Sequence, residues 1–161
     1  MKTKALIFLL PLTFLFLLTS SCSYKFQDAT DAFNKKDYKT AYRIFLKLAE
    51  QGNAEAQYYL GLIHDQGLGV PQDFEEAVKQ YRLAADQGWD GNEEAQYNLG
   101  VMYAEGNEVL QDYSLAHMWF NIAFSNGASK ALEKRKNLES QMTPQQIEKA
   151  QEMAGNWKPK D

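Results

Sequence analysis

The sequence is poor in the residues from which most catalytic and metal sites are built. It has one cysteine and two histidines in 161 residues, so no disulfide can form within the chain. His64 and His117 each lack a second potential ligand three or four residues away, the spacing that places two ligands on one face of a helix. We therefore expect neither a metal site nor a cofactor.

Motifs that activate a nucleophile or bind a phosphate are also missing. The sequence contains no G-x-S-x-G and no S-x-x-K, which are the arrangements that activate a serine. The glycines of "QGLGVPQD" are typical of a turn between helices and not of a phosphate-binding loop. The sequence therefore predicts a protein without catalytic residues.

The first 21 residues differ from the rest of the chain. A basic start is followed by an almost wholly apolar run over residues 5–18 and by small polar residues before Cys22, the order of a secretory signal peptide. The alternative is a membrane-spanning helix. Residues 5–21 would extend only roughly 25 Å as a helix, which is short of a hydrocarbon core of ~30 Å. We predict a signal peptide over residues 1–21.

Cys22 stands where the predicted signal peptide ends. The stretch "LTSSC" resembles the lipobox of bacterial lipoproteins, although Thr19 occupies the place where that family prefers leucine. The resemblance implies that Cys22 becomes the lipid-modified N-terminus and anchors the protein to a membrane of the cell envelope. The alternative is an exported soluble protein, periplasmic or secreted, with a free thiol.

Acidic residues outnumber basic residues. Removal of residues 1–21 takes away two of the 17 basic residues, Lys2 and Lys4, and leaves 15 against 21 acidic residues, a formal balance of −6. This excess disfavours the nucleic-acid backbone or an anionic lipid surface as the main partner. We expect a protein or peptide partner, no nucleic acid, and membrane attachment only through the lipid.

The remainder of the chain repeats itself. The stretches "DYKTAYRIFLKLAEQG", "DFEEAVKQYRLAADQG" and "DYSLAHMWFNIAFSNG" end at Gly52, Gly88 and Gly127, with spacings of 36 and 39 residues. "AQYYLGLIHDQG" and "AQYNLGVMYAEG" precede the second and third of them. A period of this length is typical of stacked helix pairs.

Two further features concern the start and the packing of the predicted helices. Asp73 and Glu76 have the spacing of a capping box at the start of a helix. Gly61 and Gly100 lie inside predicted helices, where a glycine costs about 1 kcal/mol. We expect a neighbouring helix to approach closely at both glycines, because no side chain keeps it away.

These residues resemble the pattern of Sel1-like repeats, which are relatives of tetratricopeptide repeats. One copy of the pattern comprises Ala56, Leu60, Gly61, Gly67, Gly69, Val70, Asp73, Ala77, Ala84, Ala85 and Gly88. The next copy comprises Ala95, Leu99, Gly100, Tyr103, Gly106, Val109, Asp112, Ala116, Trp119, Ala123 and Gly127.

The resemblance implies an all-α fold, a short right-handed α-solenoid of antiparallel helix pairs over residues 22–161. We predict a tetratricopeptide-like pair at 26–52, repeat cores at 53–88 and 92–127, and capping helices at 128–157. In the last segment Thr143 is the expected N-cap, with Pro144 at the first helical position.

The first helix of each pair lines the concave side of the superhelix in such families. In a helical projection, one stripe of the first helix comprises Ala56, Leu60, Ile63 and His64, and a second apolar stripe comprises Ala54, Tyr58 and Gly61. The predicted groove residues are those that neither stripe uses: Glu55, Tyr59, Leu62 and Gln66, and in the next copy Glu94, Asn98, Val101 and Glu105. An exposed tyrosine and two aliphatic residues among acids would suit an apolar or basic peptide segment. The alternative is a solvated face without a function.

The resemblance implies a non-catalytic scaffold for protein–protein interaction in the bacterial cell envelope. Two other functions stay open. Some members of the family are penicillin-binding or weakly hydrolytic, although this sequence lacks the paired cysteines of that branch. Alternatively, the open ends of the array stack into a structural assembly.

Overall fold

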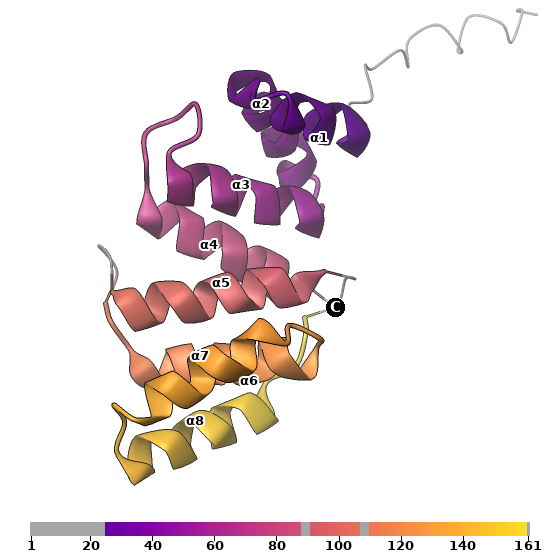
Figure 1. The fold of residues 1–161 in the computed structure, drawn as a ribbon. Helices are drawn as coiled ribbons and strands as arrows, with labels where there is room; N and C mark the ends of the chain where they lie inside the picture. Colours follow the sequence, from indigo (N-terminus) through magenta and orange to yellow (C-terminus); the bar gives the residue numbers. More distant parts are fainter. Residues whose placement is uncertain (1–24, 88–90, 107–109, 161) are drawn as a thin grey trace, which may run out of the picture.

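The computed structural model describes residues 25–87, 91–106 and 110–160, and all regular secondary structure in these ranges is helical (Figure 1). The predicted signal peptide and Cys22 lie outside the described residues, as do Gly88 and Val109. The described helices are α1 (Phe26–Asn34), α2 (Tyr38–Glu50), α3 (Ala54–Gln66), α4 (Phe74–Ala85), α5 (Asn92–Glu105), α6 (Tyr113–Ser125), α7 (Lys130–Glu139) and α8 (Pro144–Asn156).

The helices stack in chain order into an α-solenoid. Each helix from α1 to α6 packs against the next one, and both α7 and α8 pack against α6. The result is an elongated array with α1 and α2 at one end and α8 at the other (Figure 1). The prediction of an all-α solenoid is confirmed.

Aspartate N-caps start the second helix of three successive pairs. Each carboxylate accepts a hydrogen bond from the backbone N–H three residues later, at 2.9–3.2 Å. The caps are Asp37, Asp73 and Asp112. The predicted capping box at Glu76 is wrong, because this carboxylate instead accepts hydrogen bonds from Lys79 Nζ at 2.9 Å and Gln80 Nε2 at 2.6 Å.

At Gly61 and Gly100 the paired helices approach each other closely. A Cβ at Gly61 would lie 2.5 Å from the ring of Tyr81, and a Cβ at Gly100 would lie 2.6 Å from the ring of Phe120. Both rings are fully buried. The predicted close approach is confirmed, and it explains why the duplicated phrase keeps glycine inside a helix.

The glutamine of the duplicated phrase links one pair of helices to the next. Gln96 in α5 is fully buried. Its Oε1 accepts a hydrogen bond from Asn126 Nδ2 at 2.9 Å, and its Nε2 donates to the carbonyl of Ala85 at 3.5 Å. Gln96 therefore bridges the ends of α4 and α6. One repeat earlier, Gln57 makes the equivalent hydrogen bonds: its Oε1 accepts from Gln87 Nε2, and its Nε2 donates to the carbonyl of Ala49.

Helix α8 and the residues after it seal the far end of the array. Thr143 forms a capping box with Gln146 at the start of α8. At the other end the Trp157 ring packs edge-on against Trp119, with ring centroids 5.9 Å apart. Lys160 Nζ then forms an ion pair with Asp86 at 2.5 Å. The chain end is thereby fastened to the end of α4.

Lys36, in the turn between α1 and α2, has a left-handed backbone with φ of 62°. This conformation costs a residue other than glycine roughly 1–2 kcal/mol. Glycine avoids that cost but loses more conformational entropy on folding, which cancels roughly half of the gain. We expect Lys36→Gly to raise the free energy of unfolding by about 0.5–1 kcal/mol. Urea unfolding measures the change. The matched control is Lys35→Gly, at φ of −79°, which should bring no gain.

Candidate functional site

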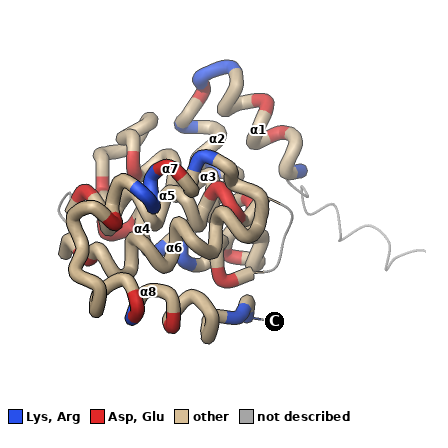
Figure 2. The backbone as a smooth tube through the Cα atoms, turned by 60° about the horizontal axis from the view of Figure 1, so that its bottom comes forward, with Lys and Arg blue, Asp and Glu red and all other residues tan. Residues whose placement is uncertain are grey.

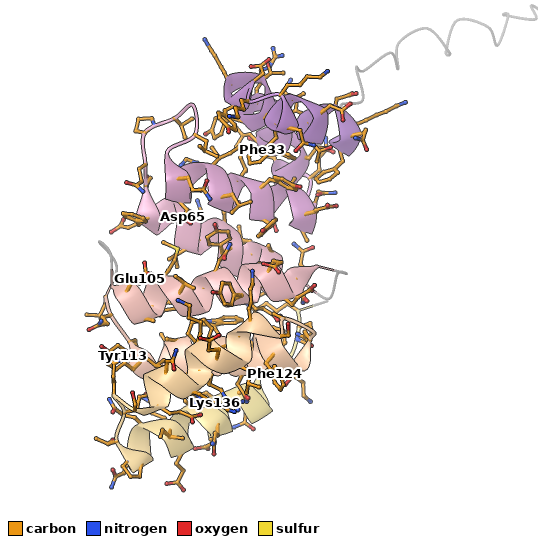
Figure 3. All side chains as sticks on the ribbon, in the orientation of Figure 1. Phe33, Asp65, Glu105, Tyr113, Phe124 and Lys136 are labelled. Atoms are coloured by element: carbon orange, nitrogen blue, oxygen red, sulfur yellow. The ribbon has the colours of Figure 1, made fainter. Side chains whose placement is uncertain are left out.

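Three of the eight predicted groove residues meet at a cavity between successive first helices. Asn98, Val101 and Glu105 of α5 line a space of about 110 Å³, which we call the α3–α5 cavity. Figure 3 shows Asp65 and Glu105 at neighbouring ends of α3 and α5, on the same side of the molecule. The remaining residues of its lining are Asp65, Phe74 and Met102.

A second, larger cavity adjoins the first. It has a volume of about 230 Å³ and lies between α5, α6 and α7; we call it the α5–α7 cavity. Val101 and Glu105 line both cavities, so the two spaces flank the same stretch of α5. The other lining residues are Ala104, Tyr113, Phe120, Lys134, Asn137, Leu138 and Gln141.

The structure corrects the predicted exposure of Tyr59. Its side chain is half-buried, and the ring stacks on Phe45 with centroids 4.7 Å apart and planes 9° from parallel. The edges of Phe26 and Phe33 also contact Tyr59. Helix α1 contributes both phenylalanines, so Tyr59 belongs to the core between α1, α2 and α3.

The other predicted groove residues line neither cavity. Leu62 is half-buried against the core cluster of α4, α5 and α6. Glu94 forms an ion pair with Lys130 of α7 at 2.6 Å. Burial raises the pKa of the Glu55 carboxyl, and Gln66 is exposed in the last position of α3. Of the eight predicted groove residues, only Asn98, Val101 and Glu105 of α5 therefore line a cavity.

Charge is distributed unevenly over the helices that border the cavities. Helices α3 and α5 carry acidic residues and no lysine or arginine, whereas α7 is rich in lysine and arginine (Figure 2). The acidic residues are Glu55, Asp65, Glu93, Glu94 and Glu105. The α3–α5 cavity therefore lies between two acidic helices, and the α5–α7 cavity lies between an acidic and a basic one.

Asp65 is the residue with the most unusual environment in the α3–α5 cavity. Its Oδ2 accepts a hydrogen bond from the Tyr81 hydroxyl at 3.2 Å. Burial raises the pKa of Asp65, the bond from Tyr81 opposes this, and repulsion by Glu105 raises the pKa further. Burial and the charge of Asp65 also raise the pKa of Tyr81, so the phenol remains a donor. The carboxylate is thus held in place although its charge is poorly solvated.

Asp65→Asn is expected to increase stability at neutral pH. An acid with a raised pKa in the folded state favours folding when protonated and opposes it when charged. Asparagine keeps an acceptor for Tyr81 but carries no charge. The gain over the wild type should therefore be present at neutral pH and shrink as the pH falls toward the usual carboxyl value of 3.8. Thermal unfolding across this pH range measures it, and a gain that does not change with pH would contradict the assignment.

The histidines have packing roles in the structure. His117 is buried, and its Nε2 lies 2.9 Å from a carboxylate oxygen of Glu139. The edge of the His64 ring contacts Tyr42, with centroids 5.7 Å apart. Within the described ranges, no three histidine, cysteine, aspartate or glutamate side chains come together as a metal site would require. In the same ranges, no helix combines the length and apolarity needed to cross a membrane.

Comparison with known families agrees with the repeat structure. The Sel1 repeat model matches residues 35–53, 54–89 and 93–127, which together make up more than half of the chain. The chain belongs to the Sel1 repeat family. Sel1 repeats generally mediate protein–protein interactions, and the fold is typically a non-enzymatic scaffold.

Two solved structures resemble this one over most of its length. The first is c5321, a protective antigen of uropathogenic Escherichia coli strains with an SLR fold, at 32% identity and a TM-score of 0.74 over 80% of this chain and 28% of that chain. The second is a Sel1 repeat protein from Oxalobacter formigenes, at 28% identity and a TM-score of 0.60 over 76% of this chain and 52% of that chain.

Curated relatives match over a shorter range. The DAP3-binding cell death enhancer 1 proteins of Rattus norvegicus and Mus musculus are 36% and 34% identical to this chain over 64 residues. The match covers 40% of this chain and 12% of each relative. The shared region is therefore shorter than two repeat periods and is a small part of a much longer protein.

Proposed function

We propose that this Sel1 repeat protein is a non-catalytic scaffold that binds a protein or peptide partner across the α3–α5 and α5–α7 cavities. The observation that carries this proposal is the adjacency of the two cavities, which share Val101 and Glu105. A partner segment lying over this part of α5 would reach side chains of three successive first helices. Stacked repeats typically use such an extended surface for binding.

The linings of the cavities support a peptide occupant. Apolar side chains stand beside charged and amide groups: Val101, Phe120 and Leu138 line the α5–α7 cavity together with Lys134 and Asn137. Protein interfaces combine apolar anchor pockets with a polar rim in this way. Neither volume reaches the roughly 300–1,000 Å³ of a typical small-molecule site, so single side chains of a partner are the better match.

Capture of partners in the protein's own cells tests the proposal. The tagged full-length chain is cross-linked beside Glu105→Arg and the matched control Glu152→Arg. Glu152 is exposed on α8, lines neither cavity, and undergoes the same change of charge. A partner captured by the wild type and the control, but at least tenfold less by Glu105→Arg, is the expected result.

Other outcomes of the same experiment bear on the alternatives. Equal capture by all three chains would place binding elsewhere on the protein. Capture of further copies of this chain alone would replace the scaffold with a self-assembling envelope protein. Covalent labelling of the folded protein by a β-lactam probe would contradict its non-catalytic character.

We further propose that the protein is exported and held in the cell envelope by lipid on Cys22. The support is the sequence order of residues 1–22, and each buried lipid methylene would contribute about 0.8 kcal/mol to membrane binding. Cys22→Ala is expected to abolish incorporation of labelled fatty acid and to release the protein from the membrane fraction. Unchanged labelling and unchanged fractionation would contradict lipid attachment.

A further inference from the structure

We infer that the α3–α5 cavity receives a lysine or arginine side chain of the partner, an inference that rests on the proposed function. The cavity brings two carboxylates, from Asp65 on α3 and Glu105 on α5, to one small space. Its described lining contains no lysine, arginine or histidine. The described lining of the cavity therefore carries two acidic side chains and no basic one.

The position of Asp65 favours a charged partner group. The carboxylate accepts a hydrogen bond through Oδ2 from the Tyr81 hydroxyl at 3.2 Å, and the Tyr81 ring is fully buried and packs against Gly61. An ammonium or guanidinium group would supply a counter-charge that no ion pair with a described residue gives Asp65, and it would relieve the repulsion by Glu105. Hydrogen bonds between charged groups are about twice as strong as those between neutral groups.

The walls of the cavity suit the stem of a long basic side chain. Phe74, Val101 and Met102 provide apolar surface beside the two acids. Lysine and arginine bury their methylene stems on such surface while the charged head reaches polar groups. A space of about 110 Å³ corresponds to roughly four waters at ~30 Å³ each, so it holds one side chain and excludes a bulky ligand.

Two observations argue against a metal ion in the α3–α5 cavity and against a basic side chain in the α5–α7 cavity. A metal ion needs more ligands, and no group of three His, Cys, Asp or Glu side chains occurs in the described part of the chain. The neighbouring α5–α7 cavity is lined by Lys134, which would repel a second basic side chain. The basic group of the partner is therefore assigned to the α3–α5 cavity, and an uncharged or acidic group would occupy its neighbour.

Titration with short peptides tests this assignment without the natural partner. The full-length chain in detergent, labelled with nitrogen-15, is titrated with the acetylated amides of Ala-Arg-Ala, Ala-Lys-Ala and the neutral control Ala-Gln-Ala. Saturable shifts of the Asp65, Asn98 and Met102 amide signals with the two basic peptides, and none with the glutamine peptide, are expected. Shifts of equal size with all three peptides, or no shift at these residues, would overturn the inference.

Two variants separate the charge of Asp65 from acidity in general. Asp65→Asn should weaken binding of the arginine peptide at least tenfold while the fold is retained. Glu133→Gln removes one negative charge from an exposed site on α7 and should leave the affinity unchanged. Equal affinities of Asp65→Asn and the wild type would also overturn the inference.

Capture in cells distinguishes the failure of this inference from the failure of the proposed function. A partner whose capture depends on Glu105 but is equal for Asp65→Asn and the wild type would agree with the proposed scaffold. The same result would contradict binding of a basic side chain in the α3–α5 cavity. The absence of any partner would contradict the scaffold, and the peptide titration would still decide the chemistry of the cavity.

Discussion

Gly100→Ala is expected to lower the free energy of unfolding by about 2 kcal/mol, the balance of two opposing effects. A methyl group at this position would lie 2.6 Å from the ring of Phe120, which is fully buried in α6. Overpacking of this kind costs about 1–3 kcal/mol, and we take a value at the upper end because the overlap is large. The higher helix propensity of alanine returns about 1 kcal/mol.

A glycine within the same protein provides the control. Gly155 lies in α8, and a Cβ added there would meet no atom within 4 Å. Gly155→Ala should therefore be neutral or stabilising by up to about 1 kcal/mol. Urea unfolding of both variants measures the difference, and a Gly100→Ala variant as stable as Gly155→Ala would contradict the close packing of α5 on α6.

Gln96→Leu is expected to lower the free energy of unfolding by about 2 kcal/mol. The substitution keeps most of the side-chain volume, so the loss arises from hydrogen bonding and not from a cavity. It removes the acceptor of Asn126 Nδ2 and leaves the carbonyl of Ala85, in a fully buried residue, without its side-chain donor. Loss of a partner to a buried polar group costs about 1–3 kcal/mol.

The position of Gln96 between two pairs of helices adds a second expectation. Its bonds join α5 to the ends of α4 and α6, so the variant should weaken the coupling between repeats. A lower dependence of the free energy on urea concentration would report a less cooperative transition. Gln151→Leu, at an exposed position of α8, is the control, and equal stability of the two variants would contradict the bridging role.

The sequence predicted the features that arise within a helix and its nearest neighbour. The helix start at Asp73 follows from local backbone chemistry, and Asp37 and Asp112 occupy the same place in the other two repeated stretches. Gly61 and Gly100 were recognisable because a costly residue recurs at the same place in two copies. Such signals need only the local sequence and the repeat period, and the structure confirms them.

The environment of Tyr59 could not be predicted in the same way. Its exposure was inferred from the projection of α3 alone, but Phe26 and Phe33 come from α1, which lies outside the two duplicated phrases. Glu94 likewise binds Lys130 of the segment that follows the last matched repeat. Contacts with the atypical ends of the array therefore determine which predicted groove residues are exposed and which are already paired.

Asp65 and Gln96 were present in the sequence without a recognisable role. Asp65 lies three residues after Leu62 and so borders the predicted face in the helical projection. Its importance depends on Tyr81, Asn98 and Glu105 from other helices. Gln96 was visible as a residue shared by both copies of the phrase, but a shared polar residue does not reveal which backbone group it will bind.

The most direct test of the scaffold is a photo-reactive amino acid placed at position 105 and, for comparison, at position 152. Both sites are exposed on helices, so neither substitution disturbs the core. The account predicts that illumination of living cells joins the chain to a protein partner from position 105 and not from position 152. The same adducts from both positions, or adducts from position 152 alone, would contradict binding at the α3–α5 and α5–α7 cavities.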